Sequence, residues 1–112
     1  MPDRITLPAA LYDTLQAEAQ RWGGVGGEQN FQQQRDKGWE PWCAHGLLRQ
    51  ARGLATGWDQ MKPVPDLVAA GLPVWLSDAA VQRCNERRGV LPPNARIPFP
   101  DWCAAANVVR GP

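Results

Sequence analysis

The sequence predicts a small, mainly α-helical domain of about four short helices joined by Gly- and Pro-rich connections. The chain has 112 residues, which suits a single domain over 1–112, and its 44% hydrophobic residues can form a core without disulfides. Eleven glycines and eleven prolines divide the chain into short elements. No segment alternates strongly between apolar and polar residues, so helices are expected to outweigh strands.

The first expected helix covers 8–22, because Pro8 is favoured in a first helical turn and apolar residues then recur at helical spacing. The residues of this apolar stripe are Leu11, Leu15, Ala19 and Trp22. A run of glycines ends the helix. The segment 23–38, which is rich in glycine and glutamine, is predicted to be a loop, with a weak solvent-facing helical turn as the alternative for 28–38.

A second helix is expected at 40–55, where Pro41 precedes a wide apolar band. A short helical turn is expected to follow at 66–70. The next segment, 72–76, is apolar and is a candidate extended edge segment, since Pro73 cannot donate a ladder hydrogen bond within a central strand.

A third helix is expected at 77–88, where Ser77 is a favourable N-cap. The segment 90–100 holds four prolines and is predicted to be extended. A last helix is expected to begin after Asp101 and to end at Gly111. Its apolar residues are Trp102, Ala105, Val108 and Val109.

The most distinctive motif is Trp-Cys-Ala, which occurs at 42–44 and again at 102–104. The stretch Pro41-Trp42-Cys43-Ala44 resembles the Trp-Cys-Ala stretch around the nucleophile of papain-like cell-wall amidases from bacteria and phages. This resemblance implies a thiol nucleophile at Cys43, and the start of a helix would stabilise its thiolate. A thiol-dependent hydrolase is therefore one alternative for the function.

The missing general base weakens that alternative. His45 is the only histidine, and positions i and i+2 of a helix do not face each other. The amidases carry their base far downstream, where this chain has no histidine. We therefore interpret Trp-Cys-Ala as a way to start and anchor a helix, so that replacing Trp42 or Trp102 is expected to reduce stability.

A metal site is a second alternative, because the chain holds four residues of the types that bind zinc. These candidate ligands are Cys43, His45, Cys84 and Cys103. The long gaps between the cysteines differ from the close pairs of structural zinc sites. No cofactor is therefore expected.

Nucleic-acid binding is a third alternative, based on arginines that cluster around the third expected helix and the segment after it. This cluster consists of Arg83, Arg87, Arg88 and Arg96. The proline-rich segment after that helix does not suit a helix-turn-helix, and the net charge of +1 gives little general attraction to nucleic acid.

Protein binding is the function that the composition favours most. Six tryptophans are many for a chain of this length, and tryptophan and arginine are enriched at interface hot spots. Three tryptophans in expected turns or extended segments are candidates for exposed binding residues: Trp39, Trp58 and Trp75. We expect a small accessory protein of bacterial or phage origin that binds another protein.

The expected location is the cytoplasm. The sequence begins without the basic and apolar regions of a signal peptide, and no apolar run is long enough for a membrane span. An odd number of cysteines also favours a reducing compartment.

Overall fold

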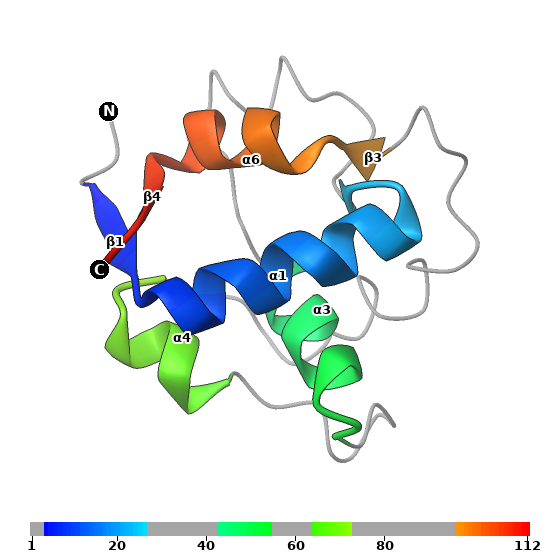
Figure 1. Ribbon diagram of the computed structural model, residues 1–112, viewed down its shortest axis with the longest axis horizontal. Helices are drawn as coiled ribbons and strands as arrows, with labels where there is room; N and C mark the ends of the chain where they lie inside the picture. The colour runs from blue at the N-terminus through cyan, green and yellow to red at the C-terminus, as the bar shows by residue number, and fades with distance from the viewer. Residues whose placement is uncertain (1–3, 27–42, 55–63, 73–95) are drawn as a thin grey trace.

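A computed structural model describes residues 4–26, 43–54, 64–72 and 96–112, and these residues are mainly α-helical, as predicted. Figure 1 shows α1 between α6 on one side and α3 and α4 on the other. The described helices are α1 (Ala9–Trp22), α3 (Cys43–Ala51), α4 (Pro65–Ala69) and α6 (Phe99–Ala106). The described strands are β1 (Ile5–Leu7), β2 (Val25–Gly26), β3 (Arg96–Ile97) and β4 (Val108–Arg110).

The strands form two pairs that join the beginning and the end of the described chain (Figure 1). β1 pairs with β4 in parallel, with Ile5 opposite Val108. β2 pairs with β3 in antiparallel, with Val25 opposite Ile97. Because β1 and β2 flank α1 whereas β3 and β4 flank α6, the two pairs hold these two helices together at both ends.

The units β1-α1-β2 and β3-α6-β4 are built in the same way. Each helix follows a proline with nearly the same extended backbone: φ −52° and ψ 143° at Pro8, φ −52° and ψ 142° at Pro98. The proline carbonyl accepts the first helical hydrogen bond, from the N–H of Tyr12 or of Trp102, at 2.9 Å in both units. Proline suits this position because its fixed φ favours the entry into a helix.

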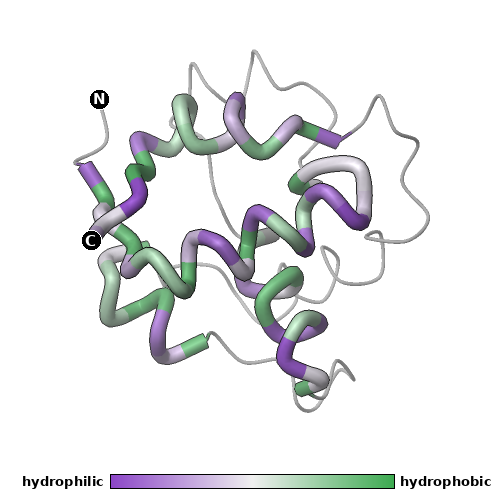
Figure 2. Tube along the Cα trace, in the orientation of Figure 1, coloured by the Kyte–Doolittle hydropathy of each residue, from purple (hydrophilic) through white to green (hydrophobic). Residues whose placement is uncertain are grey.

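The core is apolar and is shared by all the described helices. Figure 2 shows hydrophobic and hydrophilic positions alternating along α1, as expected for a helix with one buried face. Among the described residues, the largest fully buried side chain belongs to Trp102 on α6, which stacks on Phe99 with ring centroids 5.7 Å apart. Phe99 in turn meets the edge of Tyr12 from α1 at 5.1 Å. These rings join the two equivalent units.

Directly after α1, the backbone at Gly24 passes so close to β3 that glycine is required. The N–H of Gly23 bonds to the carbonyl of Gln20, and the N–H of Gly24 bonds to that of Ala19, which is a Schellman closure of the helix. Gly24 has φ +130°, and a Cβ there would lie 2.6 Å from the carbonyl oxygen of Ile97. A side chain at this position would therefore separate β2 from β3.

Two predicted boundaries near the C-terminus were wrong. The last helix already includes Phe99 and Pro100, which the sequence analysis placed in an extended segment. It ends at Ala106, because Asn107 adopts a left-handed conformation with φ 57°, which asparagine tolerates better than most residues. Val108 and Val109, predicted to be helical, form β4 instead.

The other predicted elements have mixed outcomes. The first helix and the turn at 66–70 are present, with boundaries shifted by one residue. The second helix is present as α3 and ends at Ala51, earlier than predicted, whereas residues 40–42 of that prediction lie outside the described residues. The described start of the predicted loop 23–38 contains the short strand β2, whose paired residues lie 70 and 72 positions later in the chain. Residues 27–38 of that loop lie outside the described residues. The expected helix at 77–88, residues 73–76 of the candidate edge segment, and residues 90–95 of the proline-rich segment lie outside the described residues.

Candidate binding site at the end of α1

The described thiol, Cys103, is buried and unsuited to nucleophilic attack. Its Sγ–H donates a long hydrogen bond of 4.0 Å to the Tyr12 hydroxyl. Burial raises the pKa of Cys103 from 9.0 to about 11. Because the thiolate is the reactive form, a thiol that stays protonated at neutral pH is a poor nucleophile. Cys103 therefore belongs to the core.

His45 has a structural contact in the interior. Its imidazole is 2% exposed, and its Nδ1 accepts a 2.9 Å hydrogen bond from the backbone N–H of Val64. Since a backbone N–H can only donate, Nδ1 acts as the acceptor and the proton of the neutral ring lies on Nε2. His45 thus connects α3 to the residue that caps α4.

The metal and thiol alternatives gain no support from these positions. Cys43 is the first residue of α3, and Cys84 lies outside the described residues. Within the described ranges, no group of three or more His, Cys, Asp or Glu side chains is placed to hold a metal ion.

Most of the predicted binding residues also lie outside the described residues: Trp39, Trp58, Trp75, Arg83, Arg87 and Arg88. Arg96 is described, and it lies in β3 with 6% of its surface exposed. Its Nη1 donates to the carbonyl oxygen of Gly24 at 3.5 Å. The guanidinium of Arg96 therefore supports the turn after α1 from the inside, where it is not a surface contact.

The same end of α1 carries a polar cluster, which we call the Trp22 cluster: Glu18, Arg21 and Trp22. The indole N–H of Trp22 donates a 2.6 Å hydrogen bond to Oε1 of Glu18. The Glu18 side chain is nearly buried, whereas the Trp22 ring is half-buried. The guanidinium carbon of Arg21 lies 5.3 Å from the centre of the Trp22 ring, a distance that permits a cation–π interaction.

Helix geometry explains how these three side chains meet. Glu18 and Trp22 are four residues apart, and Glu18 and Arg21 are three apart, so all three lie on neighbouring turns of α1. Trp22 was predicted to belong to the apolar stripe of the helix, and no functional role was predicted for Glu18. The i,i+3 and i,i+4 spacing of a carboxylate, an arginine and a tryptophan is the signal that could have identified the cluster.

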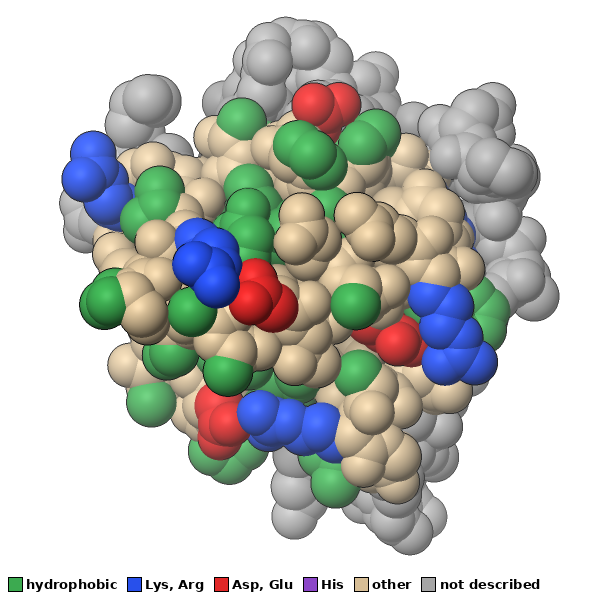
Figure 3. All heavy atoms as spheres, viewed as in Figure 1, with side chains coloured by type: hydrophobic (Ala, Val, Ile, Leu, Met, Phe, Trp, Pro, Cys, Tyr) green, Lys and Arg blue, Asp and Glu red, His purple; other side chains and the backbone are tan. Residues whose placement is uncertain are grey.

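The ion pair of Arg21 is longer than those of Arg52 and Arg110, which are also surface arginines of the described residues. Nη1 of Arg21 lies 3.6 Å from Oε1 of Glu18, which is longer than a normal hydrogen bond, and the Arg21 side chain is 64% exposed. Arg52, in contrast, lies 2.6 Å from Asp66. Figure 3 shows basic and acidic side chains in contact at several places on this face of the molecule.

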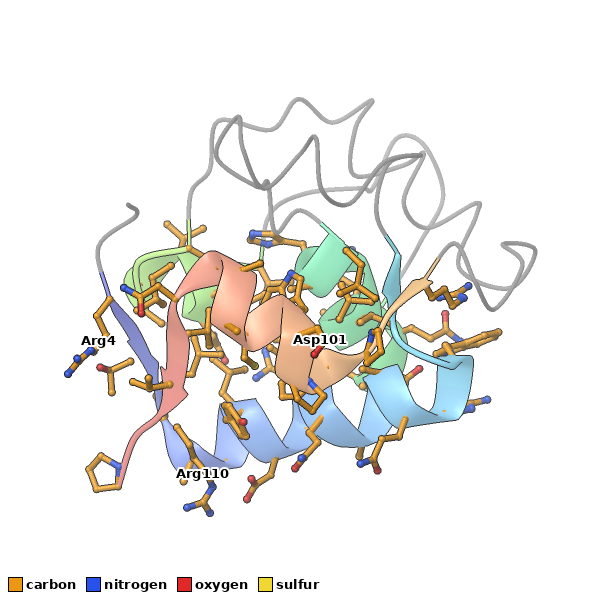
Figure 4. The ribbon with its side chains drawn as sticks, turned by 90° about the horizontal axis from the view of Figure 1, so that it is seen from above. Arg4, Asp101 and Arg110 are labelled. Carbon is orange, nitrogen blue, oxygen red and sulfur yellow. The ribbon has the colours of Figure 1, made fainter. Side chains whose placement is uncertain are left out.

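Towards the opposite end of α1, an ion pair connects the helix to β4. Arg110 donates from Nε and Nη2 to the two carboxylate oxygens of Asp13, at 3.0 and 3.1 Å. This contact lowers the pKa of Asp13 and raises that of Arg110. Figure 4 shows the side chains of Arg4 and Arg110 extending outward at this end, whereas Asp101 lies on the first turn of α6.

Exposed large apolar side chains are scattered over the described surface: Leu54, Val68 and Val109. None of the described helices has the length and apolar character needed to cross a membrane.

Comparison with protein families, with curated proteins and with solved structures finds no match to this chain.

Proposed function

We propose that this chain is a small accessory protein that binds another protein, with Trp22 at the centre of the contact. The observation that supports this proposal is the 2.6 Å hydrogen bond from the Trp22 indole to the nearly buried Glu18 carboxylate. It holds a large, partly exposed aromatic ring, which also packs against the core, in one orientation at the end of α1.

A fixed aromatic ring is a favourable binding residue for a physical reason. Ordering a flexible side chain in an interface costs about 0.5–1.5 kcal/mol, and a ring that is already ordered avoids most of this cost. Tryptophan and arginine are also the residues that most often dominate the energy of protein interfaces. The Arg21 guanidinium beside the ring adds such a residue next to Trp22.

The proposal keeps the cytoplasmic location and the bacterial or phage origin that the sequence favours. It does not include hydrolysis at Cys43 or nucleic-acid binding by the arginine cluster, since no described contact favours either.

The experiment that tests this function is selection of binders from a random peptide display library against the full-length chain. We expect the selected peptides to lose about 30-fold in affinity for Trp22→Ala, which corresponds to the roughly 2 kcal/mol of an interface hot spot. Val109→Ala is the matched control, because it removes an exposed apolar side chain from β4.

Two variants of Glu18 test the orientation of the ring without changing the ring itself. Glu18→Gln keeps an oxygen that accepts the indole hydrogen bond, whereas Glu18→Ala removes it. Circular dichroism establishes that each variant is folded. Selected peptides that bind wild type, Trp22→Ala and Glu18→Ala equally well would show that Trp22 is not the binding centre.

A further inference from the structure

Resting on the proposed function, we infer that the partner presents an acidic segment, with a carboxylate that pairs with Arg21 while an apolar group packs against Trp22. The inference depends on the charges at the end of α1, on the hydrogen-bonding capacity of Arg21, and on the way the Trp22 ring holds the guanidinium in place.

The Trp22 cluster exposes its positive charge to solvent and keeps its negative charge nearly buried. The guanidinium of Arg21 lies at the surface, and that of Arg96 lies beneath the turn at Gly24. Glu18 supplies the carboxylate of the Trp22 cluster, and its Oε1 already accepts the indole hydrogen bond. An incoming carboxylate would therefore meet an exposed cation with a buried anion behind it.

Arg21 retains the donors that a carboxylate needs. A guanidinium has five N–H donors, and its best partner is a carboxylate bound through two parallel hydrogen bonds. Arg110 has this arrangement with Asp13, at 3.0 and 3.1 Å. Arg21 has no such arrangement with any described residue, since its contact with Glu18 is 3.6 Å long.

The Trp22 ring also restricts where the guanidinium of Arg21 lies. The 5.3 Å separation leaves the cation over the ring, and a guanidinium in this position can keep its N–H groups available to a third group. A carboxylate bound there would contact Arg21 at the edge of the Trp22 ring. The neighbouring apolar part of the same segment would then cover the ring.

A protein carboxylate fits this cluster better than a nucleic-acid backbone does. Nucleic-acid binding gains most of its strength when many phosphates are neutralised at once, and the whole chain has a net charge of only +1. A carboxylate needs one guanidinium, which is what the Trp22 cluster offers. Arg21-dependent binding of single-stranded nucleic acid would therefore contradict the inference, and the test below includes it.

The test uses the peptides selected above, each with a counterpart in which Asp and Glu are replaced by Asn and Gln. We expect enrichment of Asp and Glu among the selected sequences. Arg21→Gln should weaken an acidic peptide about fivefold and leave its uncharged counterpart unchanged, as for one exposed ion pair. Raising the salt concentration should reduce this difference.

Two further variants are expected to strengthen binding of the acidic peptide or to leave it unchanged. Glu18→Gln keeps the indole acceptor but removes the negative charge, so it should strengthen binding of the acidic peptide. Arg4→Gln removes an exposed arginine beside β1, at the other end of α1, and should have no effect. With 14 residues, α1 separates the two positions by about 20 Å.

Each remaining outcome has a definite meaning. Peptides that depend on Trp22 but show no acidic preference and no response to Arg21→Gln would overturn this inference and leave the proposed function standing. Tighter, Arg21-dependent binding of a 20-nucleotide oligo(dT) would overturn the inference in favour of nucleic acid. Peptides that do not depend on Trp22 would contradict the proposed function itself.

Discussion

The buried thiol of Cys103 predicts a loss of stability at alkaline pH that can be calculated from the structure. Burial raises the pKa of Cys103 to about 11, whereas the thiol of the unfolded chain has a pKa of 9.0. Between these two values the unfolded chain releases the proton and the folded chain keeps it. The contribution is therefore complete below pH 9 and is lost as the pH rises through 11.

The magnitude follows from the two pKa values. One pKa unit corresponds to 1.36 kcal/mol, so the full difference is about 2.7 kcal/mol well above pH 11. At pH 10 the unfolded thiol is mostly ionised and the folded thiol is mostly protonated. We expect Cys103 to lower the free energy of unfolding by about 1.4 kcal/mol between pH 7 and pH 10.

Urea unfolding at pH 7, 8.5 and 10 in the presence of a reductant measures this effect. Cys103→Ala is the control, because it removes the titration of the thiol, while its packing cost is the same at every pH and groups that do not contact Cys103 contribute to both proteins. Cys103 also raises the pKa of Tyr12, which adds to the alkaline loss of wild type in the same direction. The difference in unfolding free energy between wild type and Cys103→Ala should shrink by about 1.4 kcal/mol at pH 10. A difference that stays constant with pH would refute the burial of this thiol.

Three further predictions concern packing, backbone and a buried hydrogen bond. Trp102→Ala should cost about 3–5 kcal/mol in urea unfolding because it removes the largest fully buried side chain of the described residues, and a cost below about 1 kcal/mol would contradict that burial. Gly24→Ala should cost clearly more than Gly53→Ala, since both have positive φ but only Gly24 meets a carbonyl oxygen at 2.6 Å; equal thermal shifts would contradict the close crossing. His45→Asn, whose amide oxygen can replace Nδ1, should protect the Val64 amide from hydrogen exchange better than His45→Gln, and the reverse order would place the acceptor at Nε2.

Local sequence signals predicted the helices well. Pro8, followed by apolar residues at helical spacing, identified α1, and the proline before Cys43 identified the region of α3. These signals act within one or two turns of the chain. The mainly α fold could therefore be predicted from neighbouring residues alone.

The strands could not be predicted in this way, because their partners are distant in the sequence. Ile5 pairs with Val108, and Val25 pairs with Ile97, so no short window contains both strands of a pair. Two or three residues per strand also give no visible alternation. The left-handed Asn107 then ends α6 earlier than the valines suggested.

The candidate site was missed for a related reason. The apolar stripe of α1 was recognised from its hydrophobic residues alone, and most carboxylates are solvated, so Glu18 attracted no prediction. The structure buries Glu18, and the indole N–H of Trp22 donates a hydrogen bond to one of its oxygens. A pairwise reading of polar side chains along the helix is needed to find such a contact.

The parallel pairing of β1 with β4 has a consequence for how the chain is made. Ile5 leaves the ribosome more than 100 residues before its partner Val108, and at about 5–20 residues per second this corresponds to a delay of roughly 5–20 s. During this interval the backbone groups of β1 that later bond to β4 have no native partner. β1 can therefore reach its paired state only after β4 has been translated, and a chaperone would find β1 most accessible before then.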